Sequence, residues 1–163
     1  MKTLLILRHA KSSWEDAGVK DHDRALNPRG VHSAPRMGRL MVAEDLVPEM
    51  IISSSATRAY STAELVAGVL PADPEIETTR ELYLASPHTY LDVIADLAGD
   101  ADPVLVVGHN PAVTALVTLL TDVCEEMPTA ALAAVELDID DWADIGRARS
   151  GRLIGVWRPK DLD

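Results

Sequence analysis

The chain has 163 residues, of which 47% are hydrophobic and 25% are charged; this composition suits one folded domain, residues 1–163, and argues against disorder. Its formal net charge of −11 argues against binding to nucleic acid or to an anionic membrane, so a phosphate site would have to be a local basic pocket. No apolar run reaches the roughly 18 residues that a membrane-spanning helix needs. The single cysteine, Cys124, fits a reducing compartment, and we expect a cytoplasmic protein.

The first third of the chain predicts a buried strand, a long loop and a helix. Thr3–Leu7 is a continuous apolar run, as in a strand that is buried on both faces. A polar loop follows over residues 11–26. Asn27-Pro28 then predicts the start of a helix, because asparagine is a favoured N-cap and proline suits the first helical position. Pro35 lies within the same segment and should kink or delay the helix.

A second strand and helix follow. Glu49–Ser53 is a short strand candidate, and Ser54 or Ser55 could cap the next helix. Ile76–Thr78 then predicts an edge strand. The inward face of the intervening helix is expected to carry Tyr60, Ala63, Ala67 and Leu70.

The second half of the chain repeats the alternation. Pro87 predicts the start of a helix, Val104–Val107 a strongly buried strand, and Asn110-Pro111 the start of a further helix. Two last strands are predicted at Ala131–Leu137 and Leu153–Trp157, and they could pair with each other. Strands that alternate with helices predict an α/β sandwich with a mostly parallel sheet.

Charged and nucleophilic side chains follow three of the predicted strands. Arg8 and His9 come directly after the first strand, Arg58 follows the second, and His109 comes just after Val104–Val107. Ligands of open α/β sheets bind beyond the carboxyl ends of the strands, so these side chains could converge there. Arginine presents a fork of donors that matches phosphate oxygens, and a neutral imidazole can attack phosphorus. A second histidine, if protonated, can stabilise transition-state oxygens. Arginine and histidine are also common at strand ends, so their spacing alone does not establish that these four side chains meet at one site.

Five short motifs, in order along the chain, resemble those of the histidine phosphatase superfamily: LRHAKSSW, DRALNPRG, SSSATRAYSTAE, LYLASP and VGHNP. The closer resemblance is to the small phosphohistidine phosphatases of the SixA-like branch. Each motif is weak alone, but together they cover nearly the whole chain. The resemblance implies a three-layer α/β/α sandwich with a mostly parallel central sheet, similar to phosphoglycerate mutase.

The resemblance also implies roles for individual residues. His9 would be the nucleophile that becomes phosphorylated. His109 would be the second catalytic histidine and would also contact the phosphate. Arg8 and Arg58 match the two phosphate-binding arginines, and Arg24 matches, more loosely, an arginine that the small branch often carries near its pocket.

The acid that protonates the leaving group is less clearly marked. Larger members of the superfamily place a carboxylate after the third strand, and Glu81 in RELYLASP lies near that position. The alternative is that Glu81 is a solvated surface carboxylate. A phosphoramidate leaving group accepts a proton easily, so such a substrate could dispense with a strong protein acid.

We therefore expect a metal-independent phosphohistidine phosphatase that acts through phospho-His9 and needs no cofactor. Its partner would be a phosphorylated substrate, for which a phosphohistidine protein is one candidate. Two alternatives stay open: a broad-specificity phosphatase of small phosphate esters with the same chemistry, and a phosphate-binding module without turnover. A metal hydrolase that uses His9 and His109 as ligands is disfavoured, because the neighbouring arginines would repel a cation.

Overall fold

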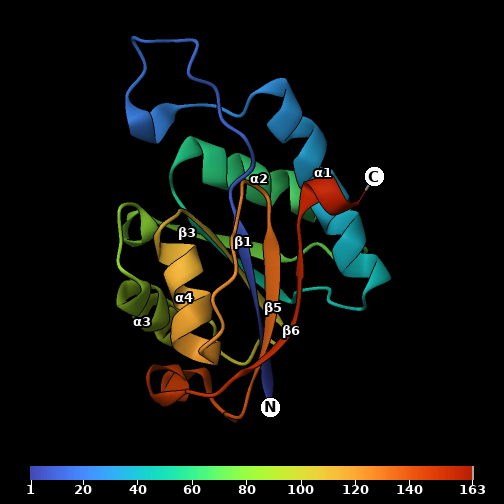
Figure 1. Cartoon of the computed structure of the whole chain (residues 1–163), viewed down its shortest axis with the longest axis vertical. Coiled ribbons are helices and arrows are strands. Elements are labelled where there is room, and N and C mark those ends of the chain that lie inside the picture. Colours follow the sequence, from blue (N-terminus) through green and yellow to red (C-terminus); the bar gives the residue numbers. More distant parts are fainter. Residues whose placement is uncertain (163) are drawn as a thin grey trace.

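A six-stranded sheet forms the centre of the structure, a computed structural model that describes residues 1–162 (Figure 1). Asp163, the last residue of the expected domain, lies outside the described residues. The strand order is β3-β2-β4-β1-β5-β6; β1 to β4 are mutually parallel, β5 is antiparallel to β1, and β6 is antiparallel to β5. The expected mostly parallel sheet and the pairing of the last two strands are confirmed. The strands are β1 (Lys2–Arg8), β2 (Met50–Ser54), β3 (Glu75–Thr79), β4 (Val104–Gly108), β5 (Leu132–Leu137) and β6 (Arg152–Trp157).

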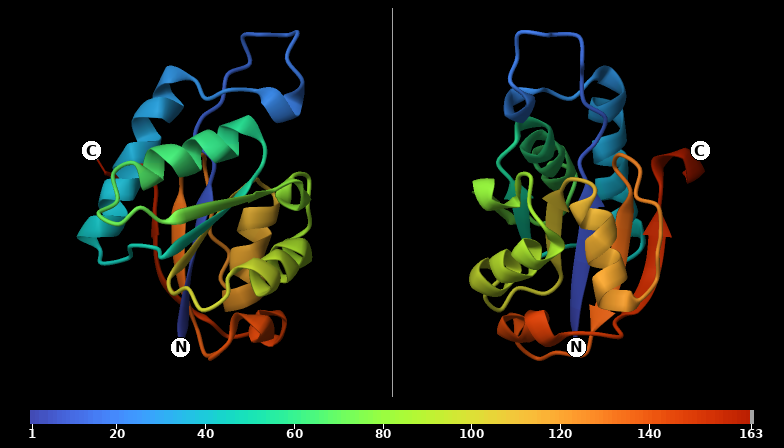
Figure 2. Two further views of the ribbon diagram at one scale, coloured as in Figure 1. Left: turned by 180° about the vertical axis from the view of Figure 1, so that it is seen from behind. Right: turned by 60° about the vertical axis from the view of Figure 1, so that its left-hand side comes forward.

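Helices cover both faces of this sheet, which confirms the three-layer architecture (Figure 2). Leu5 and Leu7 of β1 belong to one buried core, with residues of the first two helices, whereas Leu4 and Ile6 belong to the other core, with residues of the last two. This alternation is the two-residue period of a strand. None of the helices in residues 1–162 is long and apolar enough to cross a membrane. The helices are α1 (Pro28–Ala43), α2 (Thr57–Ala67), α3 (Pro87–Leu97) and α4 (Ala112–Thr121), and the 3-10 turns are η1 (Asp21–Asp23), η2 (Arg80–Leu82), η3 (Trp142–Arg147) and η4 (Pro159–Asp161).

Helix α1 begins as its sequence predicts. The side-chain oxygen of Asn27 accepts a hydrogen bond from the backbone N–H of Gly30 at 2.9 Å. The helix then runs through Pro35 without interruption, so the expected delay is wrong. Proline lacks the N–H that would bond to the carbonyl of Val31, four residues earlier, and Val31 lies on the solvent side of the helix.

Helix α2 begins differently from the expectation. Neither Ser54 nor Ser55 caps it, because the N-cap position is Ala56 and no side chain caps the helix there. Ser54 is the last residue of β2, and its hydroxyl contacts other groups that are described below. The buried face of α2 carries Ala63 as expected, but Tyr60 on the adjacent side is 38% exposed.

Candidate active site

Strands β1 and β4 place the two motif histidines beside each other. These strands pair in parallel register with Arg8 opposite Gly108, so the residue that follows each strand occupies the same level of the sheet. The backbone N–H of His9 donates to the carbonyl of Gly108 at 3.0 Å. As a result the imidazole rings of His9 and His109 have their centroids 5.1 Å apart. Neighbouring β2 leads into α2, whose first turn supplies Arg58.

A cavity of about 240 Å³ opens at this edge of the sheet, and we call it the catalytic cavity. Four cationic side chains and both histidines line it, but no carboxylate does. In a chain of net charge −11, this set makes a local positive site for an anion. The structure therefore brings five of the six predicted site residues together and leaves Glu81 elsewhere. The lining residues are Arg8, His9, Lys11, Ser12, Trp14, Arg24, Arg58, His109, Asn110 and Thr129.

The tautomer of His9 follows from one hydrogen bond. Its Nδ1 lies 2.7 Å from the carbonyl oxygen of Ala10. A carbonyl only accepts, so Nδ1 carries the proton and Nε2 keeps its lone pair. Burial lowers the pKa of His9 to about 4, and the nearby guanidinium groups of Arg58 and Arg8 act in the same direction. His9 is therefore neutral at pH 7, and the lone pair of Nε2 is free to act as a nucleophile.

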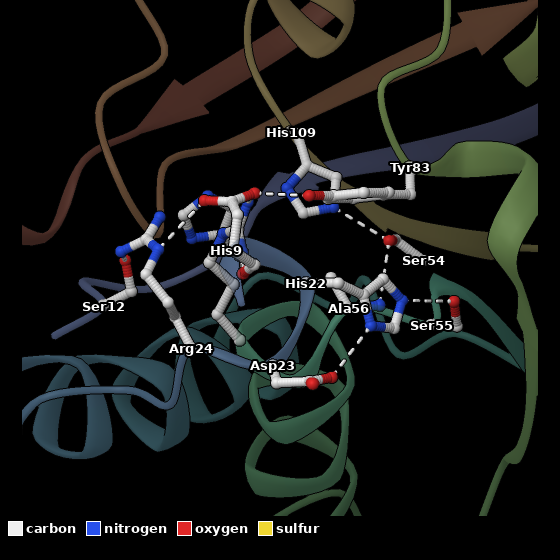
Figure 3. Close-up of polar contacts among 12 residues, drawn as sticks. His9, Ser12, His22, Asp23, Arg24, Ser54, Ser55, Ala56, Tyr83 and His109 are labelled. Carbon is white, nitrogen blue, oxygen red and sulfur yellow. Dashed lines mark hydrogen bonds and ion pairs between the residues drawn. The ribbon is translucent and has the colours of Figure 1, made fainter. Parts of the chain in front are cut away.

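His109 is oriented by Ser54. Its Nε2 lies 2.8 Å from the Ser54 hydroxyl, which also accepts a hydrogen bond from the backbone N–H of Ala56 (Figure 3). The only acceptor for the hydroxyl proton in this arrangement is Nε2 of His109, so the neutral ring carries its own proton on Nδ1. The backbone N–H of His109 donates to the Tyr90 hydroxyl at 3.1 Å, which holds the residue from behind.

His109 is neutral in the free protein. Burial, which is the largest cause, and the charges that His9 and Arg58 can carry together lower its pKa to about 3. The charge-assisted donation that a protonated second histidine would supply is therefore not available in the free protein at neutral pH. Neutral His109 still presents one N–H donor through Nδ1.

Two arginines contribute donors that the protein does not use. Among the described residues, three buried side-chain nitrogens have no hydrogen-bond partner: Nε of Arg8, Nε of Arg58 and Nδ1 of His109. Buried donors without acceptors are costly, and all three belong to the catalytic cavity. Burial and the charge of Arg58 also lower the pKa of Arg8. These features fit a site whose donors are satisfied by an oxyanion.

Arg24 is held in place on several sides. Its Nε donates to the Asp21 carboxylate at 3.0 Å, and one terminal nitrogen donates to the Ser12 hydroxyl at 2.7 Å. The Trp14 indole lies over the guanidinium, 3.5 Å from ring centroid to the central carbon. This is close enough for a cation–π interaction. The loop over residues 11–26 thus folds back to deliver Arg24 to the catalytic cavity.

Asp21 and Tyr83 join the arginines, and the sequence analysis missed both. The carboxylate of Asp21 accepts hydrogen bonds from Arg24, from Arg58 and from the Tyr83 hydroxyl. The bond from Tyr83 is the largest of the effects that lower the pKa of Asp21, to about 2. The spacing of Asp21 three residues before Arg24 was the one available signal. No signal in the sequence connected either residue to Tyr83.

Comparison with known proteins decides the family. A model of the histidine phosphatase superfamily (branch 1) matches residues 4–83. An uncharacterised protein of Mycobacterium tuberculosis strain H37Rv is 32% identical over 165 residues, which cover 94% of this chain and 100% of that protein. The chain belongs to the histidine phosphatase superfamily.

Solved structures place this member of the superfamily near the SixA-like branch. A candidate phosphohistidine phosphatase SixA from Agrobacterium tumefaciens is 29% identical, with a TM-score of 0.80, and the match covers 97% of this chain and 98% of that one. A second SixA candidate, from Nakamurella, is 27% identical with a TM-score of 0.83, and covers 97% and 96% of the two chains. The expected resemblance to this branch is confirmed.

The acid that the superfamily resemblance implied does not reach the catalytic cavity. Glu81 lies in η2 and lines a separate cavity with Glu77 and Asp96. The expectation for Glu81 is corrected, because the chain turns after η2 so that Tyr83, two residues later, faces the site instead. Tyr83 packs edge-on against the imidazole of His109, with ring centroids 5.7 Å apart.

Two further observations complete the site of this histidine phosphatase. Gly108 leaves room for Tyr90, because a Cβ at Gly108 would collide with the ring and hydroxyl of Tyr90. Within residues 1–162, no group of three or more histidine, cysteine, aspartate or glutamate side chains is placed to hold a metal ion.

Proposed function

We propose that the chain is a phosphohistidine phosphatase that acts through a phospho-His9 intermediate without a metal. The single observation that carries this proposal is the composition of the catalytic cavity: cations and a neutral histidine nucleophile line it, but no carboxylate acid does. The similarity to SixA-like structures supports the same substrate class.

In the first step, Nε2 of His9 attacks phosphorus while the bond from phosphorus to the nitrogen of the substrate breaks. Arg8, Arg58 and the Nδ1–H of His109 stabilise the negative charge on the three phosphoryl oxygens, and Arg24 adds a further donor. In the second step, water attacks phospho-His9, inorganic phosphate leaves, and His9 returns to its neutral form. The sum is phosphohistidine plus water giving histidine plus phosphate.

The lack of a carboxylate in the cavity lining favours a phosphoramidate over an ester. An alkoxide leaving group needs a proton donor, whereas the nitrogen of a leaving imidazole takes a proton readily from solvent. Asp21, the carboxylate that is bonded to Arg24 and Arg58, has its pKa lowered to about 2 and accepts three hydrogen bonds, so it is ionised at neutral pH and cannot donate. Hydrolysis of a phosphate ester would therefore lack a carboxylic acid to protonate its leaving group.

The natural partner in this proposal is a phosphohistidine-bearing protein in the cytoplasm. The lone cysteine, Cys124, is exposed and free, which suits a reducing compartment. The only contribution required of the partner is a phosphorylated imidazole that can enter the catalytic cavity.

The test measures phosphate release in EDTA from a phosphohistidine protein and from p-nitrophenyl phosphate. We expect the wild type to favour the phosphohistidine protein, His9→Gln to be inactive, and His32→Gln, which changes an exposed histidine of α1, to match the wild type. Brief incubation with labelled substrate should trap phosphate on His9 in an acid-labile, alkali-stable form. Equal release by His9→Gln, or activity lost in EDTA, would reject the mechanism, and a preference for the ester would favour the alternative.

A further inference from the structure

A second cavity adjoins the catalytic cavity. It has a volume of about 90 Å³ and shares two lining residues, Lys11 and Thr129, with the larger one. Its other polar walls come from Arg29, Ser33 and Lys160. We call these five residues the basic side pocket. Because two residues serve both cavities, a ligand in one lies directly beside a ligand in the other.

The three cations of the basic side pocket have no anionic partner among the residues that the structure describes. Lys11, Arg29 and Lys160 form no ion pair among residues 1–162, although this chain has 26 acidic residues for 15 lysines and arginines. Lys2, Lys20 and Arg39 likewise form no ion pair among residues 1–162, so what distinguishes the three cations of the pocket is that they line one cavity together. In so acidic a protein, an unpaired group of cations beside one cavity needs a reason, because they repel one another.

Arg29 is also poorly placed for the stability of its own helix. It lies in the first turn of α1, where the helix dipole favours acidic side chains, and this turn contains none. A cation at this position weakens the helix slightly unless an anion binds nearby. An anion bound beside Arg29 would offset this cost.

The fold gathers the basic side pocket from distant segments. Lys11 follows β1, Arg29 and Ser33 lie in α1, and Thr129 precedes β5. Lys160 lies in η4, and the C-terminal segment that contains η4 lies against α1 (Figure 1). Such convergence from four parts of the chain is typical of a binding site and not of one charged loop.

We infer that the basic side pocket binds a second anionic group of the substrate, a carboxylate or a phosphate, while the phosphoryl group occupies the catalytic cavity. This inference rests on the proposed phosphatase function and specifies it further. A phosphoprotein would supply an aspartate or glutamate next to its phosphorylated residue. A small substrate would supply a second phosphate. In both cases the basic side pocket selects among substrates and takes no part in the chemistry.

Two matched substrate pairs test the inference. One pair is a phosphohistidine peptide with acidic flanking residues and the same peptide with glutamine in their place. The other is an alkanediol bisphosphate and the corresponding monophosphate. Phosphoramidate, which has no second anionic group, is the reference. The double variant Arg29→Gln/Lys160→Gln removes two charges that lie outside the catalytic cavity, and Lys2→Gln/Arg39→Gln removes two from elsewhere on the surface.

We expect the wild type to have a kcat/KM about three- to tenfold higher for the anionic member of one pair, the range that two surface ion pairs provide. The preference should vanish in Arg29→Gln/Lys160→Gln and persist in Lys2→Gln/Arg39→Gln, with phosphoramidate turnover unchanged in both. It should also weaken as salt is raised. The pair that responds identifies the source of the anion.

No preference in either pair, or a preference that Arg29→Gln/Lys160→Gln retains, would overturn the inference while leaving the proposed function intact. If the wild type hydrolyses neither phosphoramidate nor the peptides, the proposed function fails instead. The inference is then decided by binding of the two peptides to the His9→Gln variant, where equal affinities would reject it.

Discussion

Asp21 holds the guanidinium group of Arg58 twice. Its backbone carbonyl accepts a hydrogen bond from one terminal nitrogen at 2.7 Å, and its carboxylate accepts one from the other at 3.2 Å. Since both terminal nitrogens are occupied, the orientation of Arg58 in the catalytic cavity depends on a residue 37 positions earlier in the chain.

Replacing Asp21 by asparagine should lower kcat/KM for the phosphorylated substrate by about five- to tenfold. The change weakens charged hydrogen bonds to Arg24 and Arg58, worth about 1 kcal/mol at a half-exposed site. Loss of the negative charge also makes the cavity more positive, but solvent screens that gain. Steady-state kinetics would show the effect mainly in KM, and Asp23→Asn, which changes only an exposed contact with His22, should behave as the wild type. Higher activity in Asp21→Asn would mean that the carboxylate competes with phosphate.

Replacing Ser54 by alanine should remove the preference of His109 for the tautomer with its proton on Nδ1. Without the hydroxyl, nothing favours the form with the proton on Nδ1, and a hydrogen bond of about 1 kcal/mol is lost. We expect kcat/KM to fall about fivefold. Nitrogen chemical shifts of the His109 ring should report Nδ1–H in the wild type and a mixture in the variant. Ser55→Ala, which removes the partner of His22, serves as the control; a wild-type ring spectrum in Ser54→Ala would refute the assignment.

The two buried histidines should make stability depend on pH between about 6.5 and 3. Their pKa values of about 4 and 3 lie below the ordinary value of 6.5, so the unfolded chain binds more protons in this window. Stability is therefore full above about pH 6.5 and falls as the pH drops, by about 1.4 kcal/mol per pH unit for each histidine at most.

Urea denaturation at pH 7 and pH 5 would measure this dependence. We expect the wild type to lose a few kcal/mol over the interval and His109→Gln to lose clearly less. The stabilisation that comes from the Asp21 carboxylate, whose pKa is lowered to about 2, is fully present above about pH 4 and is lost only below it. It therefore does not affect the comparison. An identical loss in both proteins would show that His109 is not buried in its neutral form.

Replacing Gly108 by alanine should destabilise the protein by about 2 kcal/mol or more. The added methyl group would overlap the ring and hydroxyl of Tyr90, which is fully buried, and Tyr90 could move only by giving up its bond to the backbone N–H of His109. Activity should fall as well, since His109 follows directly. Gly146→Ala, where no atom lies within 4 Å of the new methyl group, should change the melting temperature little. Equal melting temperatures for both variants would contradict this packing.

The strands of the sheet and the residues that follow them could be predicted from local sequence patterns. The apolar runs of Thr3–Leu7 and Val104–Val107 suit strands that are buried on both faces, and parallel strands share one carboxyl edge. Arg8, His9 and His109 could thus be placed at that edge from local patterns. The cap at Asn27 was equally local, because the side chain bonds three residues ahead.

The contacts that orient the side chains of the site could not be predicted in this way, because they join residues that are far apart in the chain. Asp21, Ser54 and Tyr83 act on Arg58 and His109 through hydrogen bonds and ring contacts that span dozens of residues, and no local pattern encodes such pairs. Serine is a favoured N-cap residue, which suggested a capping role for Ser54. In the structure Ser54 ends β2 beside β4, and its hydroxyl contacts His109 instead. Glu81 lies near the sequence position at which larger members of the superfamily carry an acid. The direction of a side chain depends on the turn that contains it, and in η2 Glu81 lines a cavity separate from the catalytic cavity.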